Sequence, residues 1–587
     1  MVFKKEKWTL KELIPSTNAK GVQKVIMASE GVLKKIEGYK NSFTHSITEK
    51  KFNELVDLWE RYLLLAARAS QFAQLKFAEN SKDAAAGALE AKVRQTLSEH
   101  DNRLLWLKLG FARFPKKDIN RLIDSCPNAA YFLKRLVATK DFLLSEKEEK
   151  IINLKNVNGV SALSTLYDIL TTGFTYTFMG KELTQNELLS YVRSADAKTR
   201  ELAYETLLKQ FQKHETVFGE LYRAIVSDWY SEYCELRGYP TPISVRNIAN
   251  DIPDEVVEML LSLAEKNQVL FQRYFKLKAM ALGLKKLRRF DLYAPIGKLD
   301  KKISYSDACR LVLEAFRAFS PKFYLAARML FERKHIHSAI SVGKNQGAFC
   351  SGAVPNVGPF VLLNFTGDLR SVLTLAHELG HAVHYALAAE KQSIFHVDAP
   401  LPIAETASTF SELLLIESLK KEKPELVKSL LFQELDEAYA SIGRQLEFVA
   451  FEKEAHELIK NGGSTDDLKM LYLNRLRKHF GPSVKVHKGF EIEWSYISHI
   501  FHTPFYCYAY GFGNLLAFAV YATYKQQLKK TVDRFIKMLA AGGSKSPAEL
   551  VGMLGFDITK ESFWQRGFNV ISRMIDELEA YLNKKQS

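Results

Sequence analysis

Along most of the chain the apolar positions recur with the spacing of amphipathic helices. The first clear stripe spans 52–78, where apolar residues lie at i, i+3, i+4 and i+7. A second stripe covers 84–109, so residues 1–110 are predicted to form an N-terminal helical hairpin region. Comparable stripes follow at 186–213, 217–237, 253–281, 305–319, 426–460 and 563–582. The fold class is therefore predicted to be mainly α.

Strand signals are few. Phe290–Tyr293 is a short candidate, and Phe360–Phe365 is an apolar run bounded by glycine, proline and aspartate. A loop rich in Gly, Ser and Asn spans 341–358, directly before the second run. Gly367 and Asp368 then provide a turn and an N-cap for a largely apolar helix. A small sheet is therefore expected beside this helix.

The net charge of +15 requires nucleic acid and membrane surfaces to be considered as partners. The basic residues are scattered, however, and their clusters at 285–289 and 420–423 are short. A solvated lysine-rich surface explains the charge better, so no nucleic-acid partner is predicted. Residues 503–524 carry no charge and are long enough to span a bilayer. Their proline, glycine and tyrosine content favours a buried helix and loop, so no membrane partner is predicted.

The cysteines and the amino terminus indicate the cellular compartment of the protein. Five cysteines lie far apart along the chain and form no CxxC motif, which is typical of free thiols in a reducing environment. The first eight residues are charged and include no apolar segment of the kind found in signal peptides. These features predict a cytoplasmic protein.

One helix carries the pattern HExxH, with His377, Glu378 and His381. Residues four apart share a helix face, so both imidazoles can bind one cation, and Glu378 can reach the attacking water without ligating the ion. Two core histidines satisfied by carbonyl groups or carboxylates are the structural alternative. The longer pattern HExxHxxGxxH is excluded, because this chain has His384 and Leu387 where that pattern requires glycine and histidine.

A catalytic zinc site needs a third protein ligand. Downstream, Glu405 and Glu412 lie seven residues apart on a second helix, whose first turn includes Pro402. This spacing places both carboxylates on one face. One of them could ligate the ion while the other supports a ligand histidine. With no thiolate in the set, two histidines and a glutamate predict one Zn²⁺ per chain.

Several motifs together resemble the M3 family of zinc peptidases, in particular its oligoendopeptidase F branch. They are HELGHAVH at 377–384, AETASTFSE at 404–412, GAFCSG at 347–352, LLNFTGD at 362–368 and HIFHTPFYCYAYGFG at 499–513. The resemblance runs from about residue 8 to the C-terminus. One departure is His335-Ile-His337, where relatives usually have Trp-Ile-Asp. These two histidines are candidates for an adventitious metal site, and the alternative, which the sequence favours, is packing on the surface or in the core.

The resemblance implies a two-lobed helical body with zinc at the floor of a deep channel. It assigns Glu405 as the third ligand and Glu412 as the residue supporting the metal site. It also implies that a histidine and one or two tyrosines stabilise the oxyanion, matched first to His499 and Tyr508, then to Tyr506, with Tyr510 an alternative. The expected regions are the hairpin (1–110), the rest of an N-terminal helical lobe (111–200) and a catalytic domain (201–587).

The expected function is a zinc-dependent endopeptidase that cuts internal bonds of short unstructured peptides, with Glu378 as general base. The run Phe360–Phe365 is expected to be an edge strand that pairs with an extended substrate. Two alternatives stay open. One is a related helical zinc exopeptidase, either a carboxypeptidase or a dipeptidyl carboxypeptidase. The other is a non-catalytic peptide- or nucleic-acid-binding protein, which would have no need of Glu378.

Overall fold

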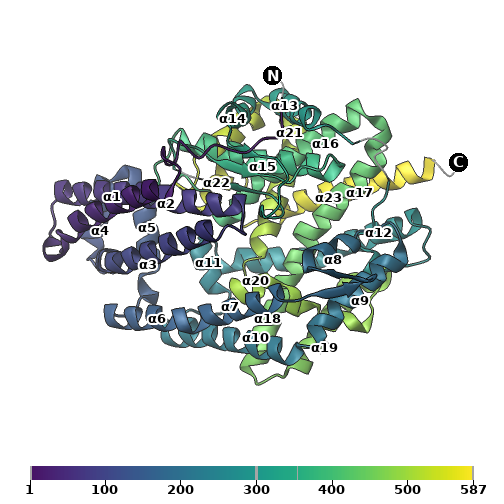
Figure 1. Cartoon of the computed structure of the whole chain (residues 1–587), viewed down its shortest axis with the longest axis horizontal. Coiled ribbons are helices and arrows are strands. Elements are labelled where there is room, and N and C mark those ends of the chain that lie inside the picture. The colour runs from purple at the N-terminus through teal and green to yellow at the C-terminus, as the bar shows by residue number, and fades with distance from the viewer. Residues whose placement is uncertain (1–2, 298–301, 353, 585–587) are drawn as a thin grey trace. The chain divides into compact units, whose positions relative to one another are not determined.

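A computed structural model describes residues 3–297, 302–352 and 354–584. Across these residues helices dominate, and the strands form three small sheets (Figure 1). The prediction of a mainly α fold is confirmed. The chain forms two compact units, each built from three separate segments. Unit 1 comprises Met1–Lys147, Leu299–Glu422 and Thr523–Asp557, and unit 2 comprises Glu148–Lys298, Lys423–Ala522 and Ile558–Ser587. The contiguous regions expected from the sequence divide the chain differently and stay a prediction.

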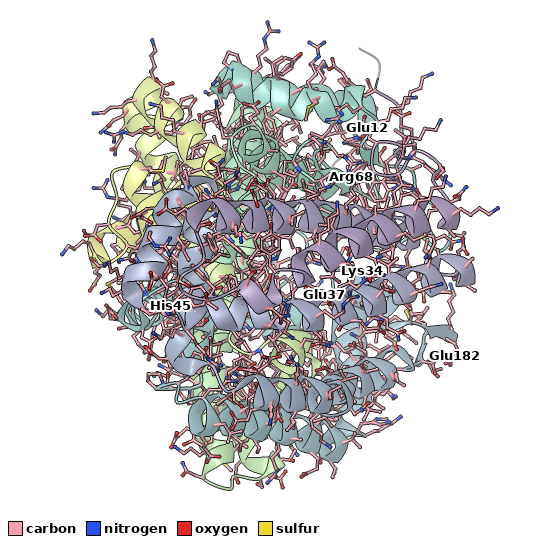
Figure 2. All side chains as sticks on the ribbon, turned by 90° about the vertical axis from the view of Figure 1, so that its left-hand side faces the viewer. Glu12, Lys34, Glu37, His45, Arg68 and Glu182 are labelled. Atoms are coloured by element: carbon pink, nitrogen blue, oxygen red, sulfur yellow. The ribbon has the colours of Figure 1, made fainter. Side chains whose placement is uncertain are left out.

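Unit 1 begins with the predicted hairpin. Helices α2 (Glu49–Glu79) and α3 (Ala84–Ala112) pack against each other, and α1 (Ala19–Glu37) contacts both. Figure 2 shows Lys34 and Glu37 as neighbours near the end of α1. The Glu37 carboxylate accepts hydrogen bonds from the Arg103 guanidinium of α3 at 2.8 and 2.7 Å. A bidentate ion pair therefore supplements the apolar packing between these helices.

The second part of unit 1 is built around one buried helix, α15 (Leu369–Ala389). It packs against α16 (Leu401–Glu422), α13 (Tyr305–Phe319) and α14 (Pro321–Glu332), as Figure 1 shows. The predicted N-cap is confirmed, because the Asp368 side chain accepts a hydrogen bond from Ser371 N at 2.7 Å. The remaining helices of unit 1 are α4 (Lys116–Ser125), α5 (Ala130–Ala138) and α22 (Pro547–Met553).

A three-stranded sheet lies against α15 in unit 1. Its order is β4 (Ile336–His337), β6 (Phe360–Leu362), β5 (Phe349–Ser351), with β6 parallel to β4 and antiparallel to β5. The N-terminal segment covers the outer side of β4, where Thr9 N donates to Lys334 O at 2.9 Å. The prediction that Phe360–Phe365 forms an edge strand is wrong, since β6 has a partner on each side. The edge is β5, which the sequence had placed in a loop.

His335 and His337 are side chains packed in the core, which was the alternative to a metal site in the sequence analysis. Both are fully buried, and the His335 ring stacks on Phe360 with ring centroids 4.1 Å apart. The His337 ring meets the edge of Trp8 at 5.4 Å. Burial lowers the pKa of each imidazole to about 4, so both are neutral near pH 7. Neither belongs to a metal-ligating cluster in the part of the chain that the structure describes.

Unit 2 is a helical body with two two-stranded sheets among its described residues. Helix α10 (Glu215–Trp229) packs on α7 (Val160–Thr172) and α18 (Arg444–Lys460), and α12 (Asp254–Ala281) packs on α23 (Glu561–Lys584). Its other elements are β1 (Tyr176–Phe178), β2 (Lys181–Leu183), α8 (Gln185–Tyr191), α9 (Ala197–Gln212), α11 (Ser244–Asn250), β3 (Leu287–Arg288), α17 (Val427–Ala438), α19 (Thr465–Phe480), β7 (Val484–Lys485) and α20 (Ser498–His502). Helices α6 (Glu146–Asn158) and α21 (Tyr508–Ala540) have residues in both units.

Two expectations for unit 2 need correction. Phe290–Tyr293 is not a strand, because the Asp291 carboxylate accepts hydrogen bonds from Arg288 and Arg200 and holds Arg289–Asp291 in a 3₁₀ turn. The stripe at 186–213 is divided between α8 and α9.

Residues 503–524 form a loop followed by the buried start of α21, as expected. None of the described helices combines the length and the apolar character that crossing a membrane requires.

Candidate active site

The two histidines of the HExxH motif lie on α15, and Glu405 lies on the adjacent helix α16. The helices approach closely at Gly380, between the histidines. A Cβ atom there would lie 2.6 Å from both Ala407 O and Ser408 Cα. Any larger residue would push the helices apart, so this glycine sets the spacing that brings Glu405 to the histidines.

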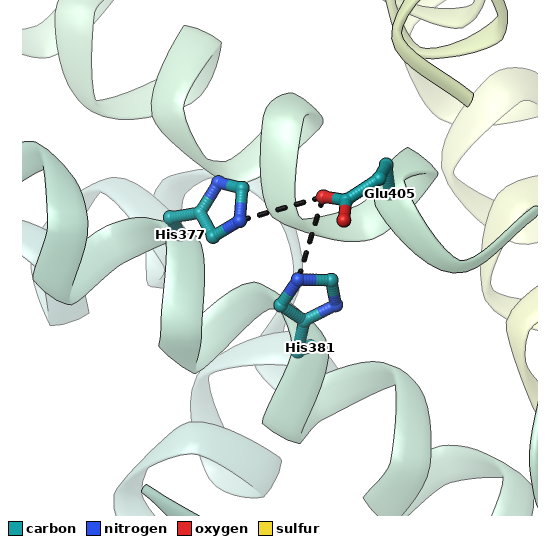
Figure 3. Close-up of side chains that lie close together, drawn as sticks. All are labelled: His377, His381 and Glu405. Atoms are coloured by element: carbon teal, nitrogen blue, oxygen red, sulfur yellow. Dashed lines mark ion pairs between the residues drawn. The ribbon is translucent and has the colours of Figure 1, made fainter. Parts of the chain in front are cut away.

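The three side chains converge on one point (Figure 3). The Nε2 atoms of His377 and His381 are each 3.4 Å from Oε2 of Glu405. The imidazole centroids lie 4.9 Å apart, with ring planes at 80°. One ligand atom from each residue lies within 4.8 Å of the others. The structure therefore brings together the two histidines and the glutamate that the sequence singled out.

Two neighbouring side chains orient this triad. Nδ1 of His377 lies 2.6 Å from Oε1 of Glu412 and forms a hydrogen bond with it. The other ring nitrogen, Nε2, therefore faces Glu405. The Ser408 hydroxyl donates to Oε2 of Glu405 at 2.9 Å. Ser408 was missed from the sequence, although its position three residues after Glu405 puts it on the same helix face.

The charges in the site favour an ionised Glu405 and a protonated His377. Burial raises the pKa of Glu405, but the hydrogen bond from His381 and the charges of both histidines lower it to about 2. Burial lowers the pKa of His377, while the hydrogen bond and charge of Glu412 raise it to about 10. Without an ion, the positive charge that neutralises these carboxylates is therefore held on imidazole.

Glu378 follows His377 on α15 and is only 6% exposed. Burial raises the pKa of its carboxyl group, while the charges of His377 and His381 lower it. Cys350 of β5 lies nearby, and burial together with the charge of Glu378 raises the pKa of its thiol well above the usual range. Cys350 does not belong to the metal-ligating cluster of the described residues.

The donor set fits a zinc ion. Two imidazole nitrogens and one carboxylate oxygen form the three-ligand pattern of catalytic zinc sites, whereas Mg²⁺ and Ca²⁺ prefer all-oxygen sets. The three residues are the one such cluster among the described residues. His377 also has the carboxylate partner that zinc-binding histidines typically have on the other ring nitrogen.

The residues matched to the oxyanion-binding group lie in unit 2. His499 of α20 stacks on Tyr506 at 5.9 Å, and the Tyr506 and Tyr510 centroids are 5.4 Å apart. The Tyr510 hydroxyl is 3.5 Å from Nε2 of His499. All three are partly exposed, and burial lowers the pKa of His499. They form a half-buried cluster of hydrogen-bonding groups, named here the His499 cluster.

Tyr508 does not belong to this cluster. It is 0% exposed, and its hydroxyl accepts a hydrogen bond from Asn250 at 2.7 Å. The side chain points into the core of unit 2, so the first-choice match of Tyr508 to the oxyanion does not fit the structure. Tyr510, an alternative in the sequence analysis, lies beside His499 instead.

Two family models match the chain. Residues 190–570 match the model described as Peptidase family M3, and residues 111–176 match the model described as Oligopeptidase F. An Oligoendopeptidase F homolog of Borreliella burgdorferi is 28% identical over 462 residues, covering 76% of this chain and 77% of the relative. An Oligoendopeptidase F homolog of Lactococcus lactis is 25% identical over 549 residues, covering 90% of both chains.

Solved structures share the fold over nearly the whole length. Oligoendopeptidase-F from Enterococcus faecium superposes with a TM-score of 0.72 and 19% identity, covering 96% of this chain and 100% of its own. PZ peptidase A, solved with an inhibitor, gives a TM-score of 0.75 with 18% identity and covers 98% of each chain. At these identities the likeness is one of fold.

Proposed function

We propose that this chain, which belongs to peptidase family M3, is a zinc-dependent endopeptidase that hydrolyses internal bonds of short unstructured oligopeptides. The observation that carries the proposal is the convergence of His377, His381 and Glu405 on one point, with Glu378 on the same helix. A binding protein would need the fold but not this combination of ligands and a buried carboxylate.

Zinc would be held by Nε2 of both histidines and a carboxylate oxygen of Glu405. When bound, the ion would polarise the scissile carbonyl and acidify the attacking water. Glu412 would keep His377 in the orientation that presents Nε2, and Ser408 would hold the Glu405 carboxylate. These partners fix the ligands before the ion arrives, which favours one geometry over looser alternatives.

Glu378 would act as the general base. It lies on α15 between His377 and His381 and outside the ligand cluster, so it would lie beside the attacking water without binding the ion. It would take a proton from the attacking water and deliver it to the leaving amine. The resemblance to the family assigns the stabilisation of the oxyanion to a histidine and one or two tyrosines, and His499 with Tyr510 and Tyr506 is the cluster that would take this role. This assignment replaces Tyr508, whose hydroxyl is bonded to Asn250.

The substrate would pair with β5. Among the described residues this strand pairs with β6 on one side and with no strand on the other, and it lies against α15. Cys350 at its centre is close enough to Glu378 for their charges to interact. An added strand is recognised through its backbone, so the substrate must be extended and its sequence matters little. Because pairing requires neither chain end, internal bonds are accessible, which favours an endopeptidase over an exopeptidase.

This pairing predicts selection by substrate conformation. An end-blocked short peptide should be cut, whereas a stably folded domain should stay intact, because its strands are already paired and cannot reach β5. Incubating both substrates with the zinc-loaded enzyme and mapping products by mass spectrometry tests this. A long denatured chain is the third substrate, and it shows whether chain length or folded structure prevents cleavage. Efficient digestion of the folded domain would contradict the proposal.

Zinc binding should release protons. Although burial lowers it, the hydrogen bond and charge of Glu412 raise the pKa of His377 to about 10, so this proposed ligand should be protonated at pH 7 and must be neutral to bind zinc. Raising the pH from 7 to 9 should therefore strengthen binding by roughly tenfold per pH unit for one proton released. Titration calorimetry in buffers of different ionisation enthalpy measures the proton count. A count of zero at pH 7 would show that His377 binds in some other way.

The location of the enzyme is part of the same proposal. All five cysteines are free thiols, and two of them, Cys309 and Cys507, are completely buried. Free buried thiols are typical of reducing compartments, which supports the cytoplasm.

A further inference from the structure

The loop between α20 and α21 in unit 2 holds a strained residue. Phe505 has φ +58°, in the left-handed region that a bulky side chain rarely adopts. Such a conformation persists only where surrounding contacts enforce it. The next residue is Tyr506 of the His499 cluster, and Tyr510 lies in the first turn of α21. The strain therefore lies at the base of the segment that presents both tyrosines.

Glu452 of α18 supplies one of those contacts. Its Oε1 accepts a hydrogen bond from the backbone N–H of Phe505 at 2.9 Å. The side chain is 1% exposed, and Oε2 has no hydrogen-bond partner in the part of the chain that the structure describes. Burial raises the pKa of this carboxyl group to about 8. Glu452 is thus a buried acid that accepts one hydrogen bond, from the backbone N–H of the strained residue.

A buried carboxyl group of this kind destabilises the folded protein. Burying an acid without a cation or a full set of donors costs folding free energy. Among the described residues Glu452 forms no ion pair, although the charge of Arg246 lowers the pKa of its carboxyl group, and its one hydrogen bond is the one from Phe505 N. An apolar residue would pack at this position at lower cost. The contact with the strained loop is therefore the feature of Glu452 that packing does not explain.

Other contacts fix the same loop from two helices. Nε of Arg246 on α11 donates to Pro504 O at 3.3 Å, and Asn250 on α11 holds the Tyr508 hydroxyl. On α18, the His456 ring packs on the Phe505 ring with centroids 4.6 Å apart. Within this set, only Glu452 bonds to the backbone of the strained residue itself.

We propose that Glu452 is a positioning residue for catalysis, which holds Phe505 in its left-handed conformation and thereby keeps Tyr506 and Tyr510 in their arrangement around His499. This inference rests on the proposed function. Misplacing a donor by about 1 Å can lower a rate by about 100-fold, although the donor itself is still present. Glu452 would therefore affect the transition state more than the binding of the substrate.

The test compares variants of the zinc-loaded enzyme on one blocked peptide. Glu452→Leu removes the acceptor and should lower kcat by about 10- to 100-fold, with KM changed by less than about 3-fold. Glu452→Gln keeps an acceptor oxygen and should restore kcat to within about 3-fold of the unchanged enzyme. Glu457→Leu, at an exposed position on the same helix, is the control and should leave both constants unchanged. Zinc content should be equal in all of them.

Should the leucine variant not fold, Glu452→Asp carries the same test, because it withdraws the acceptor by one methylene while keeping the acid. A folded leucine or aspartate variant with unchanged kcat would overturn the inference. So would a glutamine variant as slow as the leucine one. Activity and zinc dependence of the unchanged enzyme test the proposed function separately, so the two failures are distinguishable.

A double-mutant cycle shows which groups Glu452 acts through. Tyr510→Phe removes one proposed donor and should itself lower kcat. If Glu452 acts by placing that donor, Glu452→Leu should lower kcat by a clearly smaller factor in the Tyr510→Phe enzyme than in the unchanged enzyme. Full additivity of the two losses would contradict positioning through Tyr510.

Discussion

Replacing Glu378 with Gln is expected to lower kcat by about 10²- to 10⁴-fold, the range that general acid–base catalysis contributes. Glutamine has nearly the same shape but cannot accept the proton of the attacking water. Because Glu378 is outside the ligand cluster, zinc content should stay at one ion per chain. Steady-state rates on a blocked peptide and elemental analysis of the same sample measure both quantities.

The matched control is Glu390→Gln, which changes an exposed glutamate just after the end of α15. It should leave rate and zinc content unchanged, which excludes a general effect of charge on the helix. A Glu378→Gln enzyme with the rate of the unchanged protein would show that another group serves as the base. Loss of zinc from that variant would instead place Glu378 among the ligands.

Replacing Glu405 with Ala is expected to affect the metal first and the rate as a consequence. It removes one of the three proposed ligands and leaves the two histidines without the carboxylate that both contact. Losing a residue that only supports a ligand costs about 10- to 100-fold in metal affinity, so losing the ligand should cost more than about 100-fold. The purified variant should hold little zinc and cut peptides only when zinc is added in excess.

Competition with a chromogenic chelator measures the affinity directly. Glu422→Ala changes an exposed glutamate at the end of the same helix and should retain full affinity. If Glu405→Ala bound zinc as tightly as the unchanged chain, the third ligand would have to be another group.

The sequence predicted the parts of the site that depend on local geometry. Two histidines four residues apart on a helix must share a face, and Asp368 before that helix had to be its N-cap. Glu405 was one of two possible carboxylates until the family resemblance selected it. Its approach to the histidines depends on helix packing at Gly380, which spacing along one helix does not reveal.

The errors arose where contacts between distant segments decide the outcome. β6 is central because residues near 336 and 349 pair with its two sides, and a hydrophobic run alone does not show its partners. Tyr508 and Tyr510 are two residues apart in the sequence, yet one is bonded to Asn250 and the other lies beside His499. Just before both lies Phe505, whose φ is positive and whose backbone N–H donates to Glu452 on another helix, a contact that the sequence pattern does not reveal.

The most direct test of the central claim is product mapping of one short, end-blocked peptide under four conditions. These are the enzyme as purified, after chelation, after chelation with zinc restored, and the zinc-loaded Glu378→Gln variant. We expect internal cleavage in the first and third conditions and almost none in the second and fourth. Cleavage that survives chelation, or zinc-dependent activity that appears only when the peptide ends are unblocked, would contradict a zinc endopeptidase built on His377, His381 and Glu405.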